Sequence, residues 1–502
     1  MVFPNASVKS KASALRVNGL PWLGDSKAAE RNQDTQQRFL LPVLLTFIPC
    51  FLINFDLIHK TLAAPILLSV SFYSFFSPYS ALLFLTATQI IPDISSSFPL
   101  INADLAVIGW IAVTSIRRLF FPTKNKLEIP WVFIAWLTPF LGWMAICAII
   151  NADLSALKMI LKAMVIAVII WNLISQTNGR YDLCLLAILI GCLLCLPGFW
   201  GRELGISVYV PERLEIFMRN PIRGAIRIGS GRGDANTIYP FLLSAVVGFL
   251  SLTFAHTSLT TEKKTRWTLY TLSVLAVVLC LPAALATVSR GVIMCGSGSL
   301  LLLFLLSISW NPQEWPLWKK AMILGGLLGT SMAIIMWSKE FAFLSTRMDV
   351  LVNYWQKVGL TGGRENVFSP AIDAILKFPL FGLPYSEYLS KYSQGTYDIA
   401  HNTFLDIGIS GGLPGMLFSV MFFIAPYYYL MKDKRMLPAV LPTLVIYSNW
   451  LLYAQIISCL NTKVIWCLWI LLIHQISKNR QAIYLQSQNF AKLRPRHSFR
   501  GV

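Results

Sequence analysis

A histidine and an asparagine stand together where a polar segment of the sequence meets a long apolar one. His401 and Asn402 open this boundary, and the residues that follow include several glycines. An imidazole can be neutral or charged near physiological pH, so His401 is suited to accept a proton from a hydroxyl nucleophile. The alternative is that His401 caps a helix or binds a carbonyl group.

The glycines after this pair recur at helical spacing. They give one smooth face on which a neighbouring helix can pack closely. A proline in the same run is expected to bend the helix. The glycines are Gly408, Gly412 and Gly415, and the proline is Pro414.

The polar segment 200–236 contains six arginines and no lysine. Arginine without lysine favours planar, bidentate recognition of phosphate or carboxylate, although charges on a solvated loop are the alternative. Glycines around two of these arginines allow backbone N–H groups to approach an anion closely. The candidate anion ligands are Arg223, Arg227 and Arg232, with Asn236 at the end of the segment.

Arg290 stands between two apolar runs, within the sequence Thr-Val-Ser-Arg-Gly. An ionised group at membrane depth is costly and usually functional, although an arginine that marks a helix end is the alternative. Arg364 follows two glycines and is a further candidate for contact with an anion.

The composition identifies the class of protein. With 56% hydrophobic and 13% charged residues and a mean hydropathy of +0.61, the chain cannot hide its apolar residues in a water-soluble core. Long apolar runs separated by short charged loops favour helices over a barrel. The net charge of +19 is spread over many loops, so no nucleic-acid partner is expected. The nine cysteines lack metal or disulfide spacing and are interpreted as small core residues.

About fourteen apolar runs are long enough to be candidate membrane spans, within an integral domain over 39–477. We expect a flexible cytoplasmic tail over 1–38, with an organelle transit peptide as the alternative, and a basic cytoplasmic tail over 478–502. The short basic loops all fall on the cytoplasmic side when the N-terminus is inside. The candidate spans are 39–58, 62–77, 79–92, 102–115, 130–150, 155–172, 182–199, 237–255, 267–288, 291–309, 320–337, 403–430, 438–456 and 461–477.

This topology places the long segments 200–236 and 338–402 on the outer side, together with Arg290 and His401. Three of the spans, 62–77, 79–92 and 102–115, are shorter than the roughly 20 residues that cross a bilayer untilted, so one or two of them are expected to be re-entrant or packed obliquely. Within 338–402, Ser369 and Pro370 predict a helix start. Ile372, Ile375 and Leu376 then predict a short amphipathic helix along the membrane surface.

Several familiar reaction centres are missing from the sequence. It shows no paired carboxylates in an apolar run, no His/Cys/Asp metal cluster, no Walker loop and no Gly-x-Ser-x-Gly elbow. We therefore expect a reaction without ATP, without a metal and without another cofactor.

The order of these motifs resembles the O-antigen ligase and O-antigen polymerase superfamily. The matching elements cover roughly residues 225 to 420, and the His-Asn-x-x-Leu element with its glycine-rich continuation is the most specific. In chain order the elements are Asn236, Ser289-Arg290-Gly291, Arg364, Phe378-Pro379-Leu380-Phe381-Gly382, His401-Asn402-x-x-Leu405 and Gly411-Gly412-Leu413-Pro414-Gly415.

The resemblance implies an all-α polytopic fold of about 12–14 transmembrane helices, similar to GT-C enzymes, with a long periplasmic loop that carries short amphipathic helices. It implies a metal-independent, inverting glycosyltransferase of the bacterial inner membrane. A glycan would move from an undecaprenyl diphosphate carrier to the lipid A core. Arg290, with Arg227 or Arg232, would hold the diphosphate, and His401 would orient or deprotonate the acceptor hydroxyl. Arg364 would be a second anion or sugar contact.

Other functions remain open at this stage. A polymerase would join lipid-linked repeat units, and an oligosaccharide transferase would use protein hydroxyls as acceptors. A transporter of inorganic carbon or glycan would need ionisable residues near mid-membrane. Asp153 and Asp182 lie near span ends instead, which argues against ion-coupled transport.

Overall fold

The protein is an all-α polytopic membrane protein. Its structure is a computed structural model, and every regular element among the described residues is a helix. The structure describes residues 26–55, 57–74, 77–90, 131–177, 179–203, 235–259, 263–285, 287, 290–310, 325, 365–392, 400, 402–433, 436–456 and 462–493. The expected spans over 102–115 and 320–337 lie outside them.

The helices agree closely with the remaining expected spans. The largest differences are at the ends of the integral domain, because α1 begins inside the stretch 1–38 and α19 continues into the stretch 478–502. The helices are α1 (Ser26–Asn54), α2 (Lys60–Ser74), α3 (Pro78–Ala87), α5 (Trp131–Ile150), α6 (Leu154–Gln176), α7 (Tyr181–Cys192), α8 (Leu196–Glu203), α10 (Ala235–Leu259), α11 (Lys263–Leu285), α12 (Arg290–Trp310), α15 (Glu365–Lys377), α16 (Tyr385–Lys391), α17 (Thr403–Lys432), α18 (Leu437–Ala454) and α19 (Lys463–Leu493).

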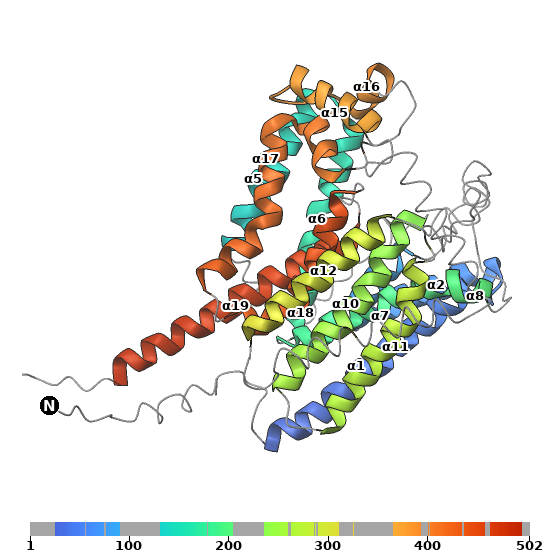
Figure 1. The fold of residues 1–502 in the computed structure, drawn as a ribbon, viewed down its shortest axis with the longest axis vertical. Coiled ribbons are helices and arrows are strands. Elements are labelled where there is room, and N and C mark those ends of the chain that lie inside the picture. The colour runs from blue at the N-terminus through green and yellow to red at the C-terminus, as the bar shows by residue number, and fades with distance from the viewer. Residues whose placement is uncertain are drawn as a thin grey trace, which may run out of the picture.

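The helices form two groups that α19 joins (Figure 1). In the first group α17 packs on α5, and α5 packs on α6, with the short helices α15 and α16 at one end. In the second group α10 packs on α11, α12 and α18, and α3 packs on α1 and α7. Because α19 contacts α6, α17, α18 and α3, the two groups share one core, from which α15 and α16 stand apart.

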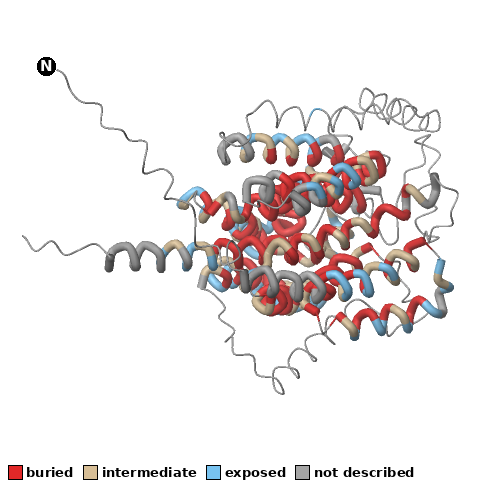
Figure 2. The backbone as a smooth tube through the Cα atoms, turned by 90° about the horizontal axis from the view of Figure 1, so that it is seen from below, coloured by how far each residue is buried: buried red, intermediate tan, exposed pale blue. Residues whose placement is uncertain are grey.

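Large aromatic side chains fill this core. Trp450 and Trp469 are fully buried, and the ring of Trp469 stacks on Phe422 of α17 with centroids 4.1 Å apart. Figure 2 shows that burial follows the inner sides of the helices. The eight described cysteines are all buried and free, which confirms their interpretation as core residues.

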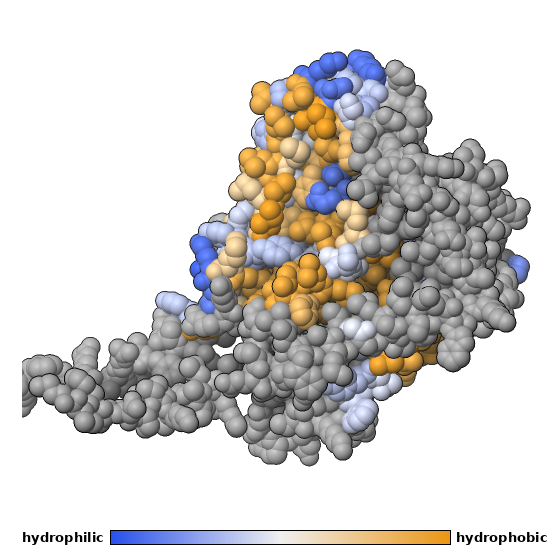
Figure 3. Space-filling model, viewed as in Figure 1, coloured by the Kyte–Doolittle hydropathy of each residue, from blue (hydrophilic) through white to orange (hydrophobic). Residues whose placement is uncertain are grey.

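The outward sides of the helices are apolar, as a bilayer requires. Ile149 at the end of α5, Leu154 at the start of α6 and Leu417 of α17 are all exposed. Figure 3 shows a hydrophobic surface that reaches from the middle of the molecule to the end formed by α15 and α16, where hydrophilic side chains gather. Among the described helices, Val132–Ile150, Leu154–Gln176 and Thr403–Lys432 are long and apolar enough to cross a membrane.

Helix α3 confirms that one expected span is too short to cross the bilayer. It has 10 residues, which at 1.5 Å per residue reach about 15 Å of a roughly 30 Å hydrocarbon layer. Ser77 caps it and Pro78 takes its first position. Nearly the whole helix is buried between neighbouring helices, so it lies within the bundle.

The predicted start of α15 at Ser369 and Pro370 is wrong. The helix begins at Glu365, and Pro370 lies inside it. A proline weakens the helix locally by removing one backbone hydrogen bond. A buried stripe continues on both sides of that proline and packs toward α17, so packing outweighs the local cost. The stripe consists of Val367, Ala371, Ala374 and Ile375.

Candidate functional site

The first turn of α17 is fixed by Asn402. Its backbone is extended, and its side-chain oxygen accepts hydrogen bonds from the N–H groups of Phe404 at 2.9 Å and Leu405 at 3.2 Å. Its side-chain amide donates to the carbonyl of Gln455, 3.2 Å away at the C-terminal end of α18. Asn402 therefore takes the capping role that was one alternative for His401, and it ties α17 to α18.

Ala400, the residue before position 401, is held by the buried carboxylate of Asp406. The Oδ1 atom of Asp406 accepts a hydrogen bond from the N–H of Ala400 at 2.9 Å and another from the hydroxyl of Tyr385 at 3.4 Å. Asp406 is only 8% exposed, and it lies in the first turn of α17, where the helix dipole favours a negative charge. Burial and, to a smaller extent, the negative charge of Asp406 raise the pKa of Tyr388.

Helix α17 is broken at Gly412, whose φ of 66° and ψ of −167° lie outside the helical region. In an unbroken helix the N–H of Leu413 would donate to the carbonyl of Ile409. Instead, Leu413 donates to Pro379 at 2.8 Å, and Ile409 accepts a hydrogen bond from Leu383 at 2.8 Å. The break thus exchanges one internal hydrogen bond for two bonds to the segment 378–383.

The break also frees the carbonyl of Gly411, which accepts a hydrogen bond from the indole of Trp143 at 2.8 Å. This partner matters because a carbonyl without one is costly at membrane depth. The expected bend in this helix is confirmed, but it lies at Gly412 rather than at Pro414.

The glycines around the break are needed for close approach. A Cβ at Gly412 would collide with the carbonyl of Leu380, and a Cβ at Gly382 would collide with the carbonyl of Ile409. Both glycines have positive φ, which other residues rarely adopt. The expected close packing is found, but against different elements: Gly408 faces Ile375 of α15, and Gly415 faces Met144 of α5. The three glycines therefore do not form the single face for one helix that the spacing predicted.

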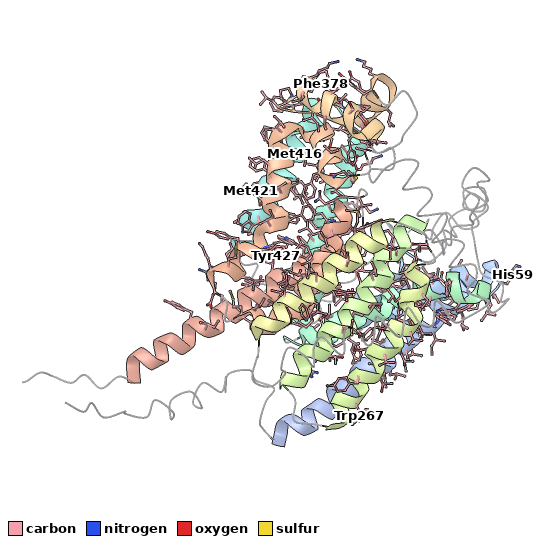
Figure 4. The ribbon with its side chains drawn as sticks, in the orientation of Figure 1. His59, Trp267, Phe378, Met416, Met421 and Tyr427 are labelled. Atoms are coloured by element: carbon pink, nitrogen blue, oxygen red, sulfur yellow. The ribbon has the colours of Figure 1, made fainter. Side chains whose placement is uncertain are left out.

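The segment 378–385 also binds the turn between α5 and α6. The amide of Asn151 donates to the carbonyl of Phe381 at 3.0 Å, and the N–H of Tyr385 donates to Oδ2 of Asp153 at 3.4 Å. The indole of Trp143 stacks on Phe381. Figure 4 shows Phe378 at this end of the molecule, with Met416, Met421 and Tyr427 successively farther from it. The sequence assigned both segments to the same side, and they lie together.

Hydrogen bonds keep the carboxyl group of Asp153, the N-cap of α6, in its ionised form. Burial alone would raise the pKa of its carboxyl. Hydrogen bonds from Ala156, Ser155 and Tyr385 outweigh burial and lower that pKa below its ordinary value. The carboxylate therefore stays ionised while it joins α6 to the first residue of α16.

The N-termini of α10 and α12 lie at the same end as the start of α17. Gly291 of α12 faces the hydroxyl of Tyr239, in the second turn of α10, so closely that a Cβ there would collide with it. The ring of Tyr239 meets that of Tyr453, in the last turn of α18, with centroids 5.4 Å apart. Since Asn402 binds Gln455 just beyond that turn, three helix N-termini meet near the end of α18. Such termini carry partial positive charge and favour anions.

Residues 275–420 match the family model described as O-antigen ligase. The chain carries an O-antigen ligase domain. The resemblance to the ligase and polymerase superfamily, inferred above from motifs, is confirmed over this region. No match to the chain was found among curated proteins.

The O-antigen ligase domain includes Arg290, Arg364, His401 and Asn402 among the predicted site residues. Of all the predicted residues, Asn402 has a described side chain, and Arg290 and Asn236 are described only as the first residue of α12 and the second of α10. The roles of all of them stay predictions. Those outside the described residues are Arg223, Arg227, Arg232, Arg364 and His401.

Two residues at this end of the O-antigen ligase domain were missed by sequence reasoning. Asp406 gave a usable signal, because a carboxylate in the first turn of an otherwise apolar helix needs a reason to be there. Tyr385 gave no comparable signal, since its hydroxyl meets Asp406 only through the fold.

Proposed function

We propose that the protein is an O-antigen ligase-type glycosyltransferase. It moves a glycan from a polyprenyl diphosphate carrier, undecaprenyl diphosphate, to a hydroxyl of the lipid A core. The observation that carries the proposal is the match of residues 275–420 to the O-antigen ligase family, because this region contains Arg290, Arg364 and His401. Such a transfer needs two cationic side chains that bind the diphosphate and one titratable base for the acceptor hydroxyl.

The donor side of the proposed site binds the diphosphate. Arg290, with Arg227 or Arg232, carries the charge that a metal ion would supply elsewhere, and stabilises the negative charge that develops on the leaving diphosphate. Arg223 and Asn236 belong to the same side, and Arg364 contacts a second phosphate or a sugar. The meeting of the N-termini of α10 and α12 supports this assignment, since Asn236 and Arg290 stand in their first turns.

The acceptor side is the start of α17. His401 takes the proton of the acceptor hydroxyl, whose oxygen forms a bond to the anomeric carbon of the donor glycan. The bond between that carbon and the diphosphate oxygen breaks, and polyprenyl diphosphate leaves with the electron pair. Attack from the face opposite the leaving group inverts the anomeric configuration. Asn402 supports the acceptor side by fixing the backbone next to His401.

The site faces the periplasm in this proposal, and the protein spans the inner membrane with both termini in the cytoplasm. The positions of the basic loops support this orientation. The contact of the turn 151–153 with the segment 378–385 supports it too, because both were assigned to the outer side.

A polymerase of lipid-linked repeat units is the nearest alternative. The surface glycans of a strain that lacks the protein separate the two. Loss of all long chains from the lipid A core, with lipid-linked polymer accumulating, indicates a ligase. A single repeat unit on the core indicates a polymerase. A core profile and a pool of lipid-linked glycan that both remain unchanged would contradict either function.

The break in α17 is an observation that favours a transporter of inorganic carbon or glycan, because broken helices often line transport sites. In α17, however, the groups at Ile409, Gly411 and Leu413 that the break frees are bound by protein partners. Asp153 caps a helix and Asp182 pairs with Arg180 near a helix start, away from mid-membrane. Uptake of labelled substrate by proteoliposomes without a lipid donor would favour the transporter.

A further inference from the structure

Two residues on either side of His401 are held by different parts of the fold. The N–H of Ala400 is bound by Asp406, and the side chain of Asn402 is bound both to the first turn of α17 and to Gln455. Consecutive Cα atoms are about 3.8 Å apart, so both of these contacts act on residues one peptide bond away from His401. The bond of Asn402 is ordinary helix capping, but the bond of Ala400 to a buried carboxylate is not.

We propose that Asp406, held by Tyr385, is a positioning residue for His401. This inference rests on the proposed function, in which His401 takes the proton of the acceptor hydroxyl. Asp406 acts through the backbone of Ala400 and touches neither donor nor acceptor. Its Oδ1 atom accepts hydrogen bonds from Ala400 and Tyr385, which assigns it to holding the chain rather than to proton transfer.

Tyr385 connects this carboxylate to the membrane helices. Its hydroxyl donates to Asp406, and its own N–H donates to Asp153, the N-cap of α6. A line of contacts therefore runs from α6 through the start of α16 to the residue before His401. Small errors in the placement of a base cost rate, and about 1 Å of misplacement is worth roughly 100-fold.

Removing the carboxylate should therefore lower kcat without weakening donor binding. For Asp406→Ala we expect kcat per donor-binding site to fall about 10- to 100-fold, with KM for the donor within about twofold of the wild type. Asp406→Asn keeps an oxygen that can accept from Ala400, so it should restore kcat to within about threefold. Tyr385→Phe removes only the hydroxyl and should give a smaller loss. Asp373→Ala is the matched control, since it removes an exposed carboxylate of α15.

The test uses the full chain in nanodiscs, with a synthetic polyprenyl-diphosphate glycan as donor and lipid A core as acceptor. Binding of labelled donor counts the folded sites, so a merely destabilised variant loses sites rather than kcat per site.

Three results are distinguishable. If Asp406→Ala keeps the wild-type kcat per site while His401→Ala is inactive, the positioning role is overturned and the proposed function stands. A loss of kcat in Asp406→Ala that Asp406→Asn does not restore overturns it as well, because the effect would then not depend on an oxygen that accepts from Ala400. Wild-type activity in His401→Ala contradicts the proposed function itself, whatever Asp406 does.

Discussion

Leu413 donates its backbone N–H to the carbonyl of Pro379 at 2.8 Å, although an unbroken helix would direct it to Ile409. This hydrogen bond joins the two motifs Phe-Pro-Leu-Phe-Gly and Gly-Gly-Leu-Pro-Gly, which lie about thirty residues apart in the sequence. The segment before α16 and the break in α17 thus form one structural unit. The unit holds α17 so that its first turn, next to His401, meets the end of α18.

Replacing the glycine at the break should destabilise this unit. In Gly412→Ala the added Cβ meets the carbonyl of Leu380, and the positive φ is strained, so we expect a loss of about 1–3 kcal/mol or more. Gly142→Ala is the matched control, because a Cβ at that helical position of α5 meets nothing within 4 Å. Thermal unfolding of the detergent-solubilised protein checks both. Equal midpoints for the two variants would contradict the close approach.

Trp143→Phe should leave the freed carbonyl of Gly411 with only the weak thiol donor of Cys147, whose sulfur lies 3.9 Å away. A buried acceptor that loses its partner costs about 1–3 kcal/mol, and a thiol replaces only part of that bond, so the thermal midpoint should fall. Trp267→Phe, at an exposed position of α11, is the control and should have little effect. The same midpoint in both variants would show that the indole of Trp143 contributes only packing.

The lowered pKa of Asp153 predicts that the protein loses stability in acid. Its pKa is lowered in the folded protein, so its contribution is fully present above the ordinary value of 3.8 and is lost as the pH falls through the folded pKa. We expect the thermal midpoint of the wild type to drop below about pH 4. Asp153→Asn keeps a capping oxygen but cannot titrate, so its midpoint should depend less on pH in this range. Identical pH profiles would exclude Asp153 as a source of the acid sensitivity.

The helix α15 should lie at the membrane surface with one face in lipid. Leu376 of α15 and Leu380, just beyond the helix, are exposed by 64% and 59%, and the adjacent Phe381 contacts the turn between α5 and α6. A nitroxide label at Leu376→Cys should be accessible to oxygen, whereas one at Ser390→Cys on α16 should be accessible to a water-soluble relaxing agent. The chain's own described cysteines are buried, and Cys459→Ser provides the background. Equal exposure of both labels to water would contradict this position.

Much of the fold could be predicted from the sequence because a bilayer imposes simple rules. Apolar length gave the spans of α5, α6 and α18 within a few residues, and hydropathy requires helices in which backbone groups bond internally. The start of α15 was missed, since local proline preference gave no sign of the buried stripe from Val367 to Ile375. Packing between distant segments decided that boundary.

The site was predictable only in part, for a similar reason. Sequence reasoning found the His401 and Asn402 pair, because polar residues at the start of an apolar helix stand out. It could not find the contact of Asp406 with Ala400 and Tyr385, since that contact depends on how α16 folds back onto α17. It also placed the bend of α17 at Pro414, because a proline is a local signal, whereas the conformation of Gly412 depends on contacts with residues 378–383.

Transfer by the purified protein tests the central claim most directly. The full chain is reconstituted in nanodiscs with polyprenyl-diphosphate glycan and lipid A core, in buffer with EDTA, and the glycosylated core is measured by mass spectrometry. We predict product with inverted anomeric configuration from the wild type and none from Arg290→Ala or His401→Ala, with both variants folded. Undiminished product from either variant, or product from the wild type only when a divalent metal is added, would contradict the proposed mechanism.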